Sequence, residues 1–211
     1  MASERTQRKT KDKWKEKTWY TISSPSYMGG KEIITSLGNG PETMVGRKIE
    51  IPVSDLTGNF KKGTTKVVFR ITDCQGTNCS TDFMGHYVSD DYIRRMVRRR
   101  KERIDVVSKF KTSDDYLIAI KSVIVSDAKL NSNKRSSLRK KIFEVLNQKV
   151  IQSSYHEICS YIIGDDIQND IIEATKNIYP VKKLEVRKSE VIGKAKSTVQ
   201  APVAEETSAA V

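Results

Sequence analysis

The sequence predicts an α+β fold that is mainly β: a barrel-like antiparallel domain with packed α-helices, and disordered tails that are basic at the N-terminus and Ala-rich at the C-terminus. Residues 19–88 alternate strand-like runs with turns rich in Gly, Asn and Pro, which is typical of a β-meander or of part of a small barrel. After residue 131, apolar residues recur at helical spacing. We therefore expect a basic arm at 1–17, one domain at 18–194 and a disordered tail at 195–211.

Several strands are predicted by alternation of apolar and polar residues. The run 66–71 places Val67, Phe69 and Ile71 on one face, as expected for a strand with one face in water. Two further strands are expected at 104–111 and 116–125, joined by a turn, and the second is apolar on both faces. A strand of that kind is predicted to lie centrally in its sheet.

An arginine-rich segment at 94–103 holds seven Lys and Arg in ten residues and follows the sequence Ser89-Asp90-Asp91. A serine followed by two carboxylates is typical of a helix start, so we expect a helix that ends among the arginines. On a helical wheel Ile93, Met96 and Val97 form one apolar stripe and most cations surround it. Arg100 projects onto that stripe, which predicts that the helix frays there, or that the guanidinium snorkels to the surface or pairs with a buried acceptor.

Helices are expected after residue 131. A helix that opens at Ser136 would place cations in its first turns, against the helix dipole, and a neighbouring phosphate would compensate. Gly164 and Pro180 are expected to mark helix ends, and a last strand at 184–188 is expected to pair back onto the sheet. The apolar stripes of three helices are Leu138, Ile142, Val145 and Leu146; Tyr155, Ile158, Cys159 and Ile162; and Ile167, Ile171, Ala174 and Ile178.

The basic charge is segregated along the chain. The formal net charge is +12, and segments 1–17, 94–103, 134–141 and 182–196 contain 25 of the 38 Lys and Arg but only 6 of the 26 Asp and Glu. Concentrated positive charge opposes folding by self-repulsion, and a polyanion relieves it through counterion release. Nucleic acid is the expected partner. No membrane partner is expected, because neither an exposed apolar helix face nor a lipidation motif is found. A soluble intracellular protein is expected, because no stretch approaches the roughly 20 apolar residues that cross a bilayer and the N-terminus is not that of a signal peptide.

Arginine outnumbers lysine in the arginine-rich segment and is not interleaved with glutamate, which favours phosphate contact over a merely solvated helix face. The aromatic residues Trp14, Trp19 and Tyr20 would either stack on bases or anchor the arm on the sheet. The predicted RNA-binding residues are Arg94, Arg95, Arg98, Arg99, Lys101, Arg103, Lys134, Arg135, Arg139, Lys140, Arg8, Lys9, Lys11, Lys13, Lys182, Lys183, Arg187 and Lys188.

No catalytic residue, metal ligand or cofactor is expected. Three cysteines do not suit a disulfide framework; Cys74 and Cys79 would lie opposite each other in a hairpin without zinc-ligand spacing, and Cys159 belongs to a core. The acidic doublets at 90–91, 114–115 and 165–166 could suggest a metal-dependent nuclease, but helix starts and turns explain them more simply. The chain has no phosphate-binding Gly-rich loop motif.

Read in order, the motifs resemble the small-subunit ribosomal protein family shared by archaea and eukaryotes that is designated eS-one, formerly S-three-a-e. The resemblance covers most of the chain, and the modest length is more similar to archaeal members. Its motifs are "KTWY" (17–20), "GRKIEIPVSDLTG" (46–58), "QGTNCSTDFMGHYVSDDYIRRMVRRRKERID" (75–105), "KTSDDYLIAI" (111–120), "LRKKIFEVL" (138–146) and "IYPVKKLEVRKSEV" (178–191).

The resemblance implies a cytoplasmic structural protein of the small ribosomal subunit, with a β-barrel-like fold and no catalytic residues. Its implied partners are small-subunit ribosomal RNA on the platform near the mRNA exit, neighbouring ribosomal proteins and, near that exit, mRNA. A free RNA-binding translation or RNA-processing factor remains the alternative. One departure is visible: Asp115 stands where the family pattern has glycine, so that turn is expected to differ slightly, because aspartate tolerates a positive φ less well.

Overall fold

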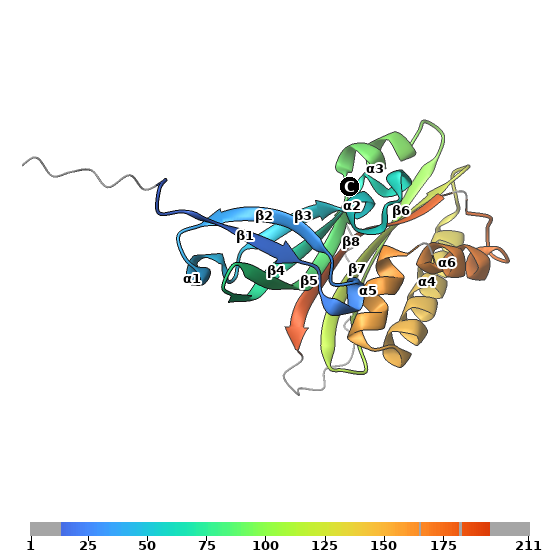
Figure 1. Ribbon diagram of the computed structural model, residues 1–211. Coiled ribbons are helices and arrows are strands. Elements are labelled where there is room, and N and C mark those ends of the chain that lie inside the picture. Colours follow the sequence, from blue (N-terminus) through green and yellow to red (C-terminus); the bar gives the residue numbers. More distant parts are fainter. Residues whose placement is uncertain (1–13, 165, 182, 195–211) are drawn as a thin grey trace, which may run out of the picture.

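The computed structural model describes residues 14–164, 166–181 and 183–194, and its main element is an eight-stranded mixed sheet (Figure 1). The strand order is β2-β1-β5-β8-β7-β6, while β4 pairs with β5 and with β3. The strands are β1 Thr18–Ser23, β2 Glu32–Gly38, β3 Lys48–Pro52, β4 Thr65–Gln75, β5 Asn78–Val88, β6 Glu102–Lys111, β7 Tyr116–Ser126 and β8 Lys183–Lys194. All pairings are antiparallel except that of β1 with β5.

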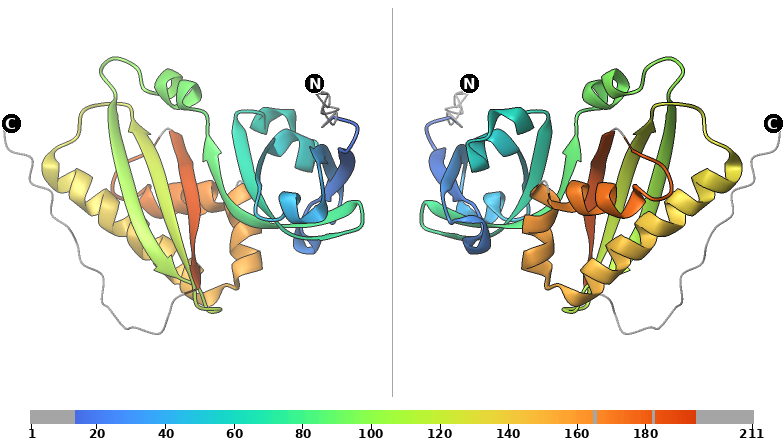
Figure 2. Two further views of the ribbon diagram at one scale, coloured as in Figure 1. Left: turned by 90° about the vertical axis from the view of Figure 1, so that its left-hand side faces the viewer. Right: turned by 90° about the vertical axis from the view of Figure 1, so that its right-hand side faces the viewer.

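The helices are short except for one. They are α1 Pro41–Met44, α2 Val53–Thr57, α3 Asp90–Met96, α4 Ser132–Gln152, α5 Tyr155–Ile163 and α6 Asp166–Thr175, with 3-10 turns η1 Ser26–Met28 and η2 Phe60–Lys62. The α+β, mainly β class is confirmed. The sheet curves like a barrel around β1 to β5, yet it is open and mixed among the described residues rather than closed and wholly antiparallel (Figure 2).

The largest core lies between the sheet and the helices α4, α5 and α6, which lie together on one side of β6, β7 and β8 (Figures 1 and 2). Leu138, Ile142 and Leu146 of α4 are buried there against Ile104 and Ile120 of the sheet. The periodicity therefore predicted the stripes of α4 and α5 well, because burial of one face is what selects those residues. In the third stripe Ile167 and Ile171 are buried, but α6 ends at Thr175, so Ile178 lies beyond it. As predicted, β7 lies between two strands and β8 pairs back onto the sheet.

The predicted helix over the arginine-rich segment is shorter than expected. α3 ends at Met96, Val97 is extended, and β6 already begins at Glu102. Pairing of Glu102 with Ser126 of β7 continues a ten-residue ladder, and those nonlocal hydrogen bonds replace the last turns of helix. Arg100 consequently lies in an exposed turn with φ 67°, so the first of the alternatives for it, that the helix does not persist there, is confirmed, and the pairing with a buried acceptor is wrong.

α4 begins one turn earlier than predicted, at Ser132 after Asn131, so Ser136 does not open it. Lys134 and Arg135 therefore occupy its first turn, which contains no acidic residue. Cations therefore do lie at the positive end of the helix dipole, which is unfavourable, but they are Lys134 and Arg135 and not Arg139, Lys140 and Lys141.

The cysteines form one disulfide bond, between Cys74 and Cys79, contrary to the expectation for this chain. The two residues are paired across the β4–β5 hairpin, as predicted, and such direct opposition brings the sulfur atoms within bonding reach. Cys159 is free and buried in α5, as expected for a core residue.

Candidate nucleic-acid interface

α3 is a charged helix fixed by a small apolar base. Ile93 and Met96 are buried against Val123 and Val125 of β7, on the sheet face opposite the large core. Asp90 and Asp91 occupy its first turn and Arg94 and Arg95 its last, so the charges at both ends favour the helix dipole. The apolar contacts position the helix while the arginines remain at the surface.

The chain then makes a turn at residues 98–101, which we call the arginine turn. Its backbone is closed by a hydrogen bond from Lys101 N to Arg98 O of 3.2 Å, and Arg98, Arg99 and Arg100 are exposed. Within the described part of the chain, neither these three side chains nor that of Arg94 has a hydrogen bond or an ion pair. Four adjacent cations thus have no counter-charge from the chain itself.

The start of α4 lies against the arginine turn. Glu102 bridges the two, since its Oε1 is 3.1 Å from Arg135 Nη1 and its Oε2 accepts a hydrogen bond of 2.6 Å from Leu130 N. Lys101 Nζ is 3.2 Å from Asp127 Oδ1 in the same region. The structure therefore brings together two basic segments that are separate in the sequence. Lys134, Arg139 and Lys140 of α4 are exposed.

The first residues of β8 extend this surface. Lys183 pairs with Val125, which pairs with Arg103, so the three lie in one row across β8, β7 and β6. Other predicted cations have acidic neighbours: Arg103 Nε is 2.8 Å from Asp105 Oδ1, Arg187 Nη2 is 3.1 Å from Asp90 Oδ1, and Lys188 pairs with Glu190. These are weaker candidates for phosphate contact than the arginine turn.

Some predicted residues lie outside the described part of the chain, namely Arg8, Lys9, Lys11, Lys13 and Lys182. Of the three aromatic residues near the N-terminus, Tyr20 is buried in a core, which fits an anchor. Trp14 and Trp19 are 69% and 62% exposed, and Lys17 Nζ lies 4.0 Å from the centre of the Trp14 ring.

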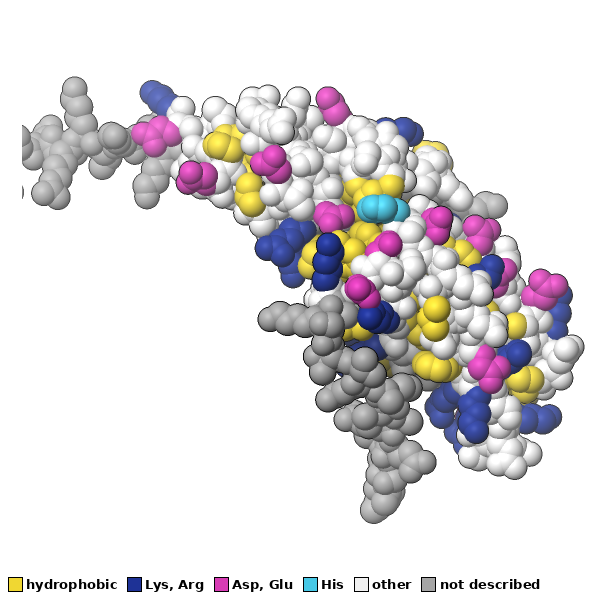
Figure 3. Space-filling model, turned by 90° about the horizontal axis from the view of Figure 1, so that it is seen from below, with side chains coloured by type: hydrophobic (Ala, Val, Ile, Leu, Met, Phe, Trp, Pro, Cys, Tyr) yellow, Lys and Arg dark blue, Asp and Glu magenta, His cyan; other side chains and the backbone are white. Residues whose placement is uncertain are grey.

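Sequence reasoning missed a lysine on the outer face of β6. Lys109 shares the face of Arg103 and Val107, is exposed, and has no ion-pair partner among the described residues. Side chains alternate between the two faces of a strand, and this alternation would have placed Lys109 on the outer face of β6. The face of the molecule that is seen from below in Figure 3 carries Asp and Glu as well as Lys and Arg.

The acidic doublets contribute to the fold. Asp90 pairs with Arg187, Asp114 Oδ2 accepts a hydrogen bond of 2.9 Å from Tyr155 N at the start of α5, and Asp166 begins α6. Asp165 lies outside the described residues. Within the described ranges no three His, Cys, Asp or Glu side chains are grouped to hold a metal ion, and no helix is long and apolar enough to span a membrane.

The chain was compared with known proteins. Residues 5–195 match the Ribosomal S3Ae family. The small ribosomal subunit protein eS1 of Thermoplasma acidophilum is 57% identical over 192 residues, covering 91% of this chain and 89% of the relative. The proteins of the same name from Picrophilus torridus and Methanobrevibacter smithii are 55% and 32% identical, covering 88% and 91% of this chain and 88% and 100% of the relatives.

The family match extends over all of the described residues, including the sheet, α3 with the arginine turn, and the helical layer. The resemblance seen in the sequence motifs is confirmed by this match and by the archaeal relatives. The protein belongs to the ribosomal S3Ae family.

Proposed function

We propose that this protein is a structural constituent of the small ribosomal subunit in the cytoplasm and binds ribosomal RNA through α3, the arginine turn and the start of α4. Family membership and the names of its relatives support the place in the small subunit. The observation that carries the RNA contact is the group of four exposed cations, Arg94 and Arg98–Arg100, that have no counter-charge within the described residues.

The proposed mechanism is electrostatic and geometric. Guanidinium groups donate paired hydrogen bonds to phosphate oxygens, and each neutralised phosphate releases counterions. The sheet and the apolar base of α3 hold the arginines in a fixed array, so that a folded RNA backbone of matching shape is preferred. No chemical step is required of such a protein, and we propose no catalytic residue, metal or cofactor.

Finer placement follows the family resemblance. We propose contact with ribosomal RNA on the platform near the mRNA exit, with neighbouring small-subunit proteins and with mRNA that passes there. Trp14 and Trp19, exposed near the basic N-terminal arm, would serve such contacts by stacking on unpaired bases.

The test measures binding to a transcribed small-subunit rRNA fragment containing the 3′ end over a range of salt concentrations. Changing Arg94, Arg95, Arg98 and Arg99 to Gln should weaken binding and reduce the slope of log affinity against log salt by about 3, or roughly 0.7 per lost contact. A matched control changes four exposed cations elsewhere, Lys31, Lys48, Lys66 and Lys176, to Gln. An unchanged slope in the arginine variant, or an equal change in the control, would contradict the proposed surface.

Sedimentation separates the ribosomal role from that of a free RNA-binding factor. In a lysate with high magnesium, nearly all of the tagged protein should travel with small subunits and whole ribosomes on a sucrose gradient. A mostly free pool would favour a free translation or RNA-processing factor instead.

A further inference from the structure

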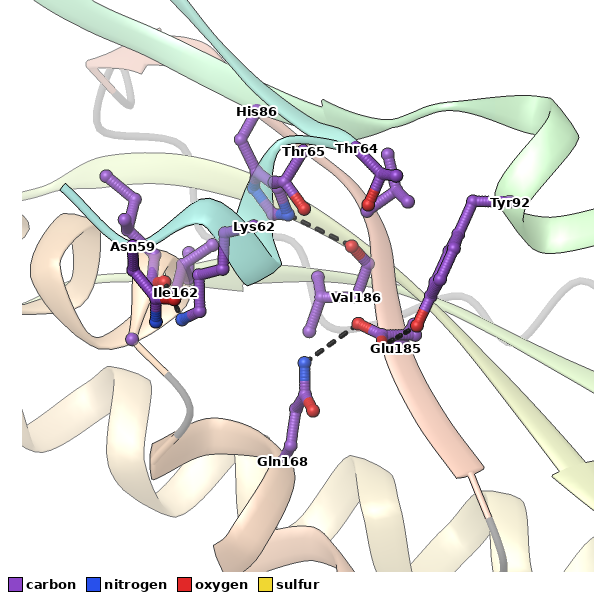
Figure 4. Close-up of a pocket in the computed structure, with 13 residues that line it drawn as sticks. Asn59, Lys62, Thr64, Thr65, His86, Tyr92, Ile162, Gln168, Glu185 and Val186 are labelled. Carbon is purple, nitrogen blue, oxygen red and sulfur yellow. Dashed lines mark hydrogen bonds between the residues drawn. The ribbon is translucent and has the colours of Figure 1, made fainter. Parts of the chain in front are cut away.

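A small cavity beside α3 belongs to the fold. It lies between η2, the strands β5 and β8 and the helices α5 and α6, and its volume is about 200 Å³ (Figure 4). Tyr92 Oη and Gln168 Nε2 donate hydrogen bonds of 3.1 and 2.8 Å to Glu185, which connects α3 and α6 to β8. Lys62 Nζ donates one of 2.7 Å to Ile163 O, which connects η2 to α5. The charged groups of this cavity therefore hold the elements around it together.

A larger groove lies where η1, the end of α4, α5 and the start of α6 meet, and its volume is about 580 Å³. Tyr27, His156 and Tyr161 contribute aromatic rings to its lining, and Val150 and Ile158 contribute apolar side chains. This volume is within the range of roughly 300 to 1,000 Å³ that is typical of ligand sites. The groove is therefore large enough to receive one or two long side chains of another molecule.

Contacts within the chain fix the aromatic rings of this groove. Tyr27 Oη donates a hydrogen bond of 2.9 Å to Asp82 Oδ1, and the Tyr27 ring packs on that of His156 with centroids 4.2 Å apart. Tyr161 Oη donates a hydrogen bond of 2.8 Å to Asp170 Oδ2. Side chains that are already ordered lose little conformational entropy when a partner binds, so the groove is preorganised for binding.

The groove lies in an acidic part of a basic chain. Residues 150–175 contain five Asp and Glu and no Lys or Arg, although the whole chain has 38 Lys and Arg. Glu157 and Asp166 line the groove, are exposed, and have no ion-pair partner within the described ranges. Lys149 also lines the groove, but its Nζ is 3.2 Å from Asp170 Oδ2. The groove is therefore negative at its rim, which attracts a cationic partner and repels a phosphate backbone.

The groove is remote from the candidate RNA surface. α4 connects the two, because Lys134 in its first turn belongs to that surface and Lys149 in its last turn lines the groove. A helix rises about 1.5 Å per residue, so these two positions are about 22 Å apart. Exposed charges farther apart than the Debye length of roughly 8 to 10 Å are largely screened from each other. RNA at one end of α4 and a cationic partner at the other are therefore compatible.

We propose that this groove binds an arginine-rich segment of a neighbouring protein of the small subunit. The aliphatic part of an arginine side chain packs on the rings of Tyr27 and Tyr161, where cation–π attraction adds to the apolar contact. Its guanidinium group then pairs with Glu157 or Asp166 at the rim. Such a partner is present where the protein has its proposed place in the small subunit, on which this proposal rests.

The first test identifies the partner in assembled small subunits. The photo-crosslinking amino acid p-benzoylphenylalanine replaces Ser160, an exposed residue of the groove, or Ser136, an exposed residue at the start of α4. After irradiation of purified subunits, position 160 should crosslink to a ribosomal protein, in a segment that mass spectrometry shows to be rich in arginine. Position 136 should crosslink to rRNA. A crosslink from position 160 to rRNA or to an acidic segment, or none at all, would overturn the proposal.

The second test uses hexa-arginine amide as a defined probe of the isolated full chain. NMR titration of the isotope-labelled protein should shift the backbone amide signals of residues 156–161. Changing Glu157 to Gln and Asp166 to Asn should weaken binding about fivefold, because two exposed charge pairs are lost. Both changes suit the fold, since Gln still completes the capping box of α5 and Asn is favoured at a helix start. The matched control changes Glu32 and Glu42, exposed residues remote in sequence, to Gln and should bind like wild type.

The outcomes separate this proposal from the RNA-binding function. The variant of Glu157 and Asp166 should bind the rRNA fragment at least as tightly as wild type, and the variant of the four arginines at 94, 95, 98 and 99 should retain its affinity for hexa-arginine. If neutralising Glu157 and Asp166 leaves hexa-arginine binding unchanged, the groove is not a site for a basic segment, while the arginine surface is unaffected. A loss of rRNA affinity in that variant would show instead that the groove faces RNA.

Discussion

β6 begins after the arginine turn and ends in a second turn at residues 112–115, which we call the acidic turn. Each turn contains a residue other than glycine with positive φ, 67° at Arg100 and 62° at Asp115. The acidic turn is closely bonded to the fold: Tyr116 N donates to Thr112 Oγ1 at 3.0 Å and Tyr155 N to Asp114 Oδ2 at 2.9 Å. In the arginine turn, the side chains of residues 98–100 make no such bond within the described chain.

This difference distinguishes structural from functional use of a polar turn. A turn whose polar groups are satisfied internally contributes to stability, and its substitution should lower the free energy of unfolding. A turn whose charges lack partners contributes little to stability, and its charges repel one another until a polyanion binds. Removing a polar side chain should therefore lower the free energy of unfolding in the acidic turn and change it little in the arginine turn.

The largest effect on folding is expected at Thr112. Thr112→Val keeps the shape but removes the acceptor of Tyr116 N at a position that is only 4% exposed. A partly buried N–H of Tyr116 left without this partner should lower the free energy of unfolding by about 1 to 2 kcal/mol. Urea denaturation measures this change, and Thr112→Ser, which keeps the hydroxyl, serves as the control. Equal losses in the two variants would show that the hydrogen bond is not the cause.

Asp114 should have the next largest effect. Asp114→Ala removes a charged acceptor from the first backbone N–H of α5 and should destabilise the protein by about 1 kcal/mol, whereas Asp114→Asn should recover part of the loss. The counterpart in the arginine turn, Arg99→Ala, should change stability by less than about 0.5 kcal/mol. A comparable loss from Arg99→Ala in the same denaturation assay would break the distinction between the turns.

Arg100→Gly should stabilise the protein. A residue other than glycine is destabilised by about 1 to 2 kcal/mol in the left-handed region. Glycine removes this strain, but it loses more conformational entropy on folding, which offsets part of the gain in stability. The net increase in unfolding free energy should be about 0.5 to 1 kcal/mol. The same variant should bind the rRNA fragment more weakly, because one cation is lost. A gain in stability without loss of RNA affinity would show that Arg100 does not contact the RNA.

The sequence predicted the parts of the fold that depend on local periodicity. The stripes of α4, α5 and α6 and the alternation in β4 and β6 follow directly from which residues are buried. The parallel pairing of β1 with β5 and the insertion of β8 between β5 and β7 have no local signal, since they depend on contacts between distant segments.

The candidate site was predicted in its composition and not in its geometry. The arginines were identified from charge, but the end of α3 was not, because strand pairing at Glu102 decides it. Proximity of the arginine turn to the start of α4, through Glu102 and Arg135, is also nonlocal. The cavity beside α3 has no motif, since its lining comes from seven separate elements and from the loops between them.

Asp115→Gly gives the smallest expected effect and the sharpest comparison with Arg100→Gly. Asp115 has a positive φ, a conformation that glycine adopts without steric cost. Aspartate tolerates the left-handed region better than arginine, and the change also removes an exposed ion pair in which Lys111 Nζ is 2.6 Å from Asp115 Oδ1. The net gain should be about 0.3 kcal/mol, smaller than that of Arg100→Gly, and RNA affinity should not fall. Paired urea denaturation and RNA titration of the two variants measure both quantities. An equal gain in stability from Asp115→Gly and Arg100→Gly would contradict this comparison. It would show that the acidic turn accommodates its positive-φ residue no better than the arginine turn does.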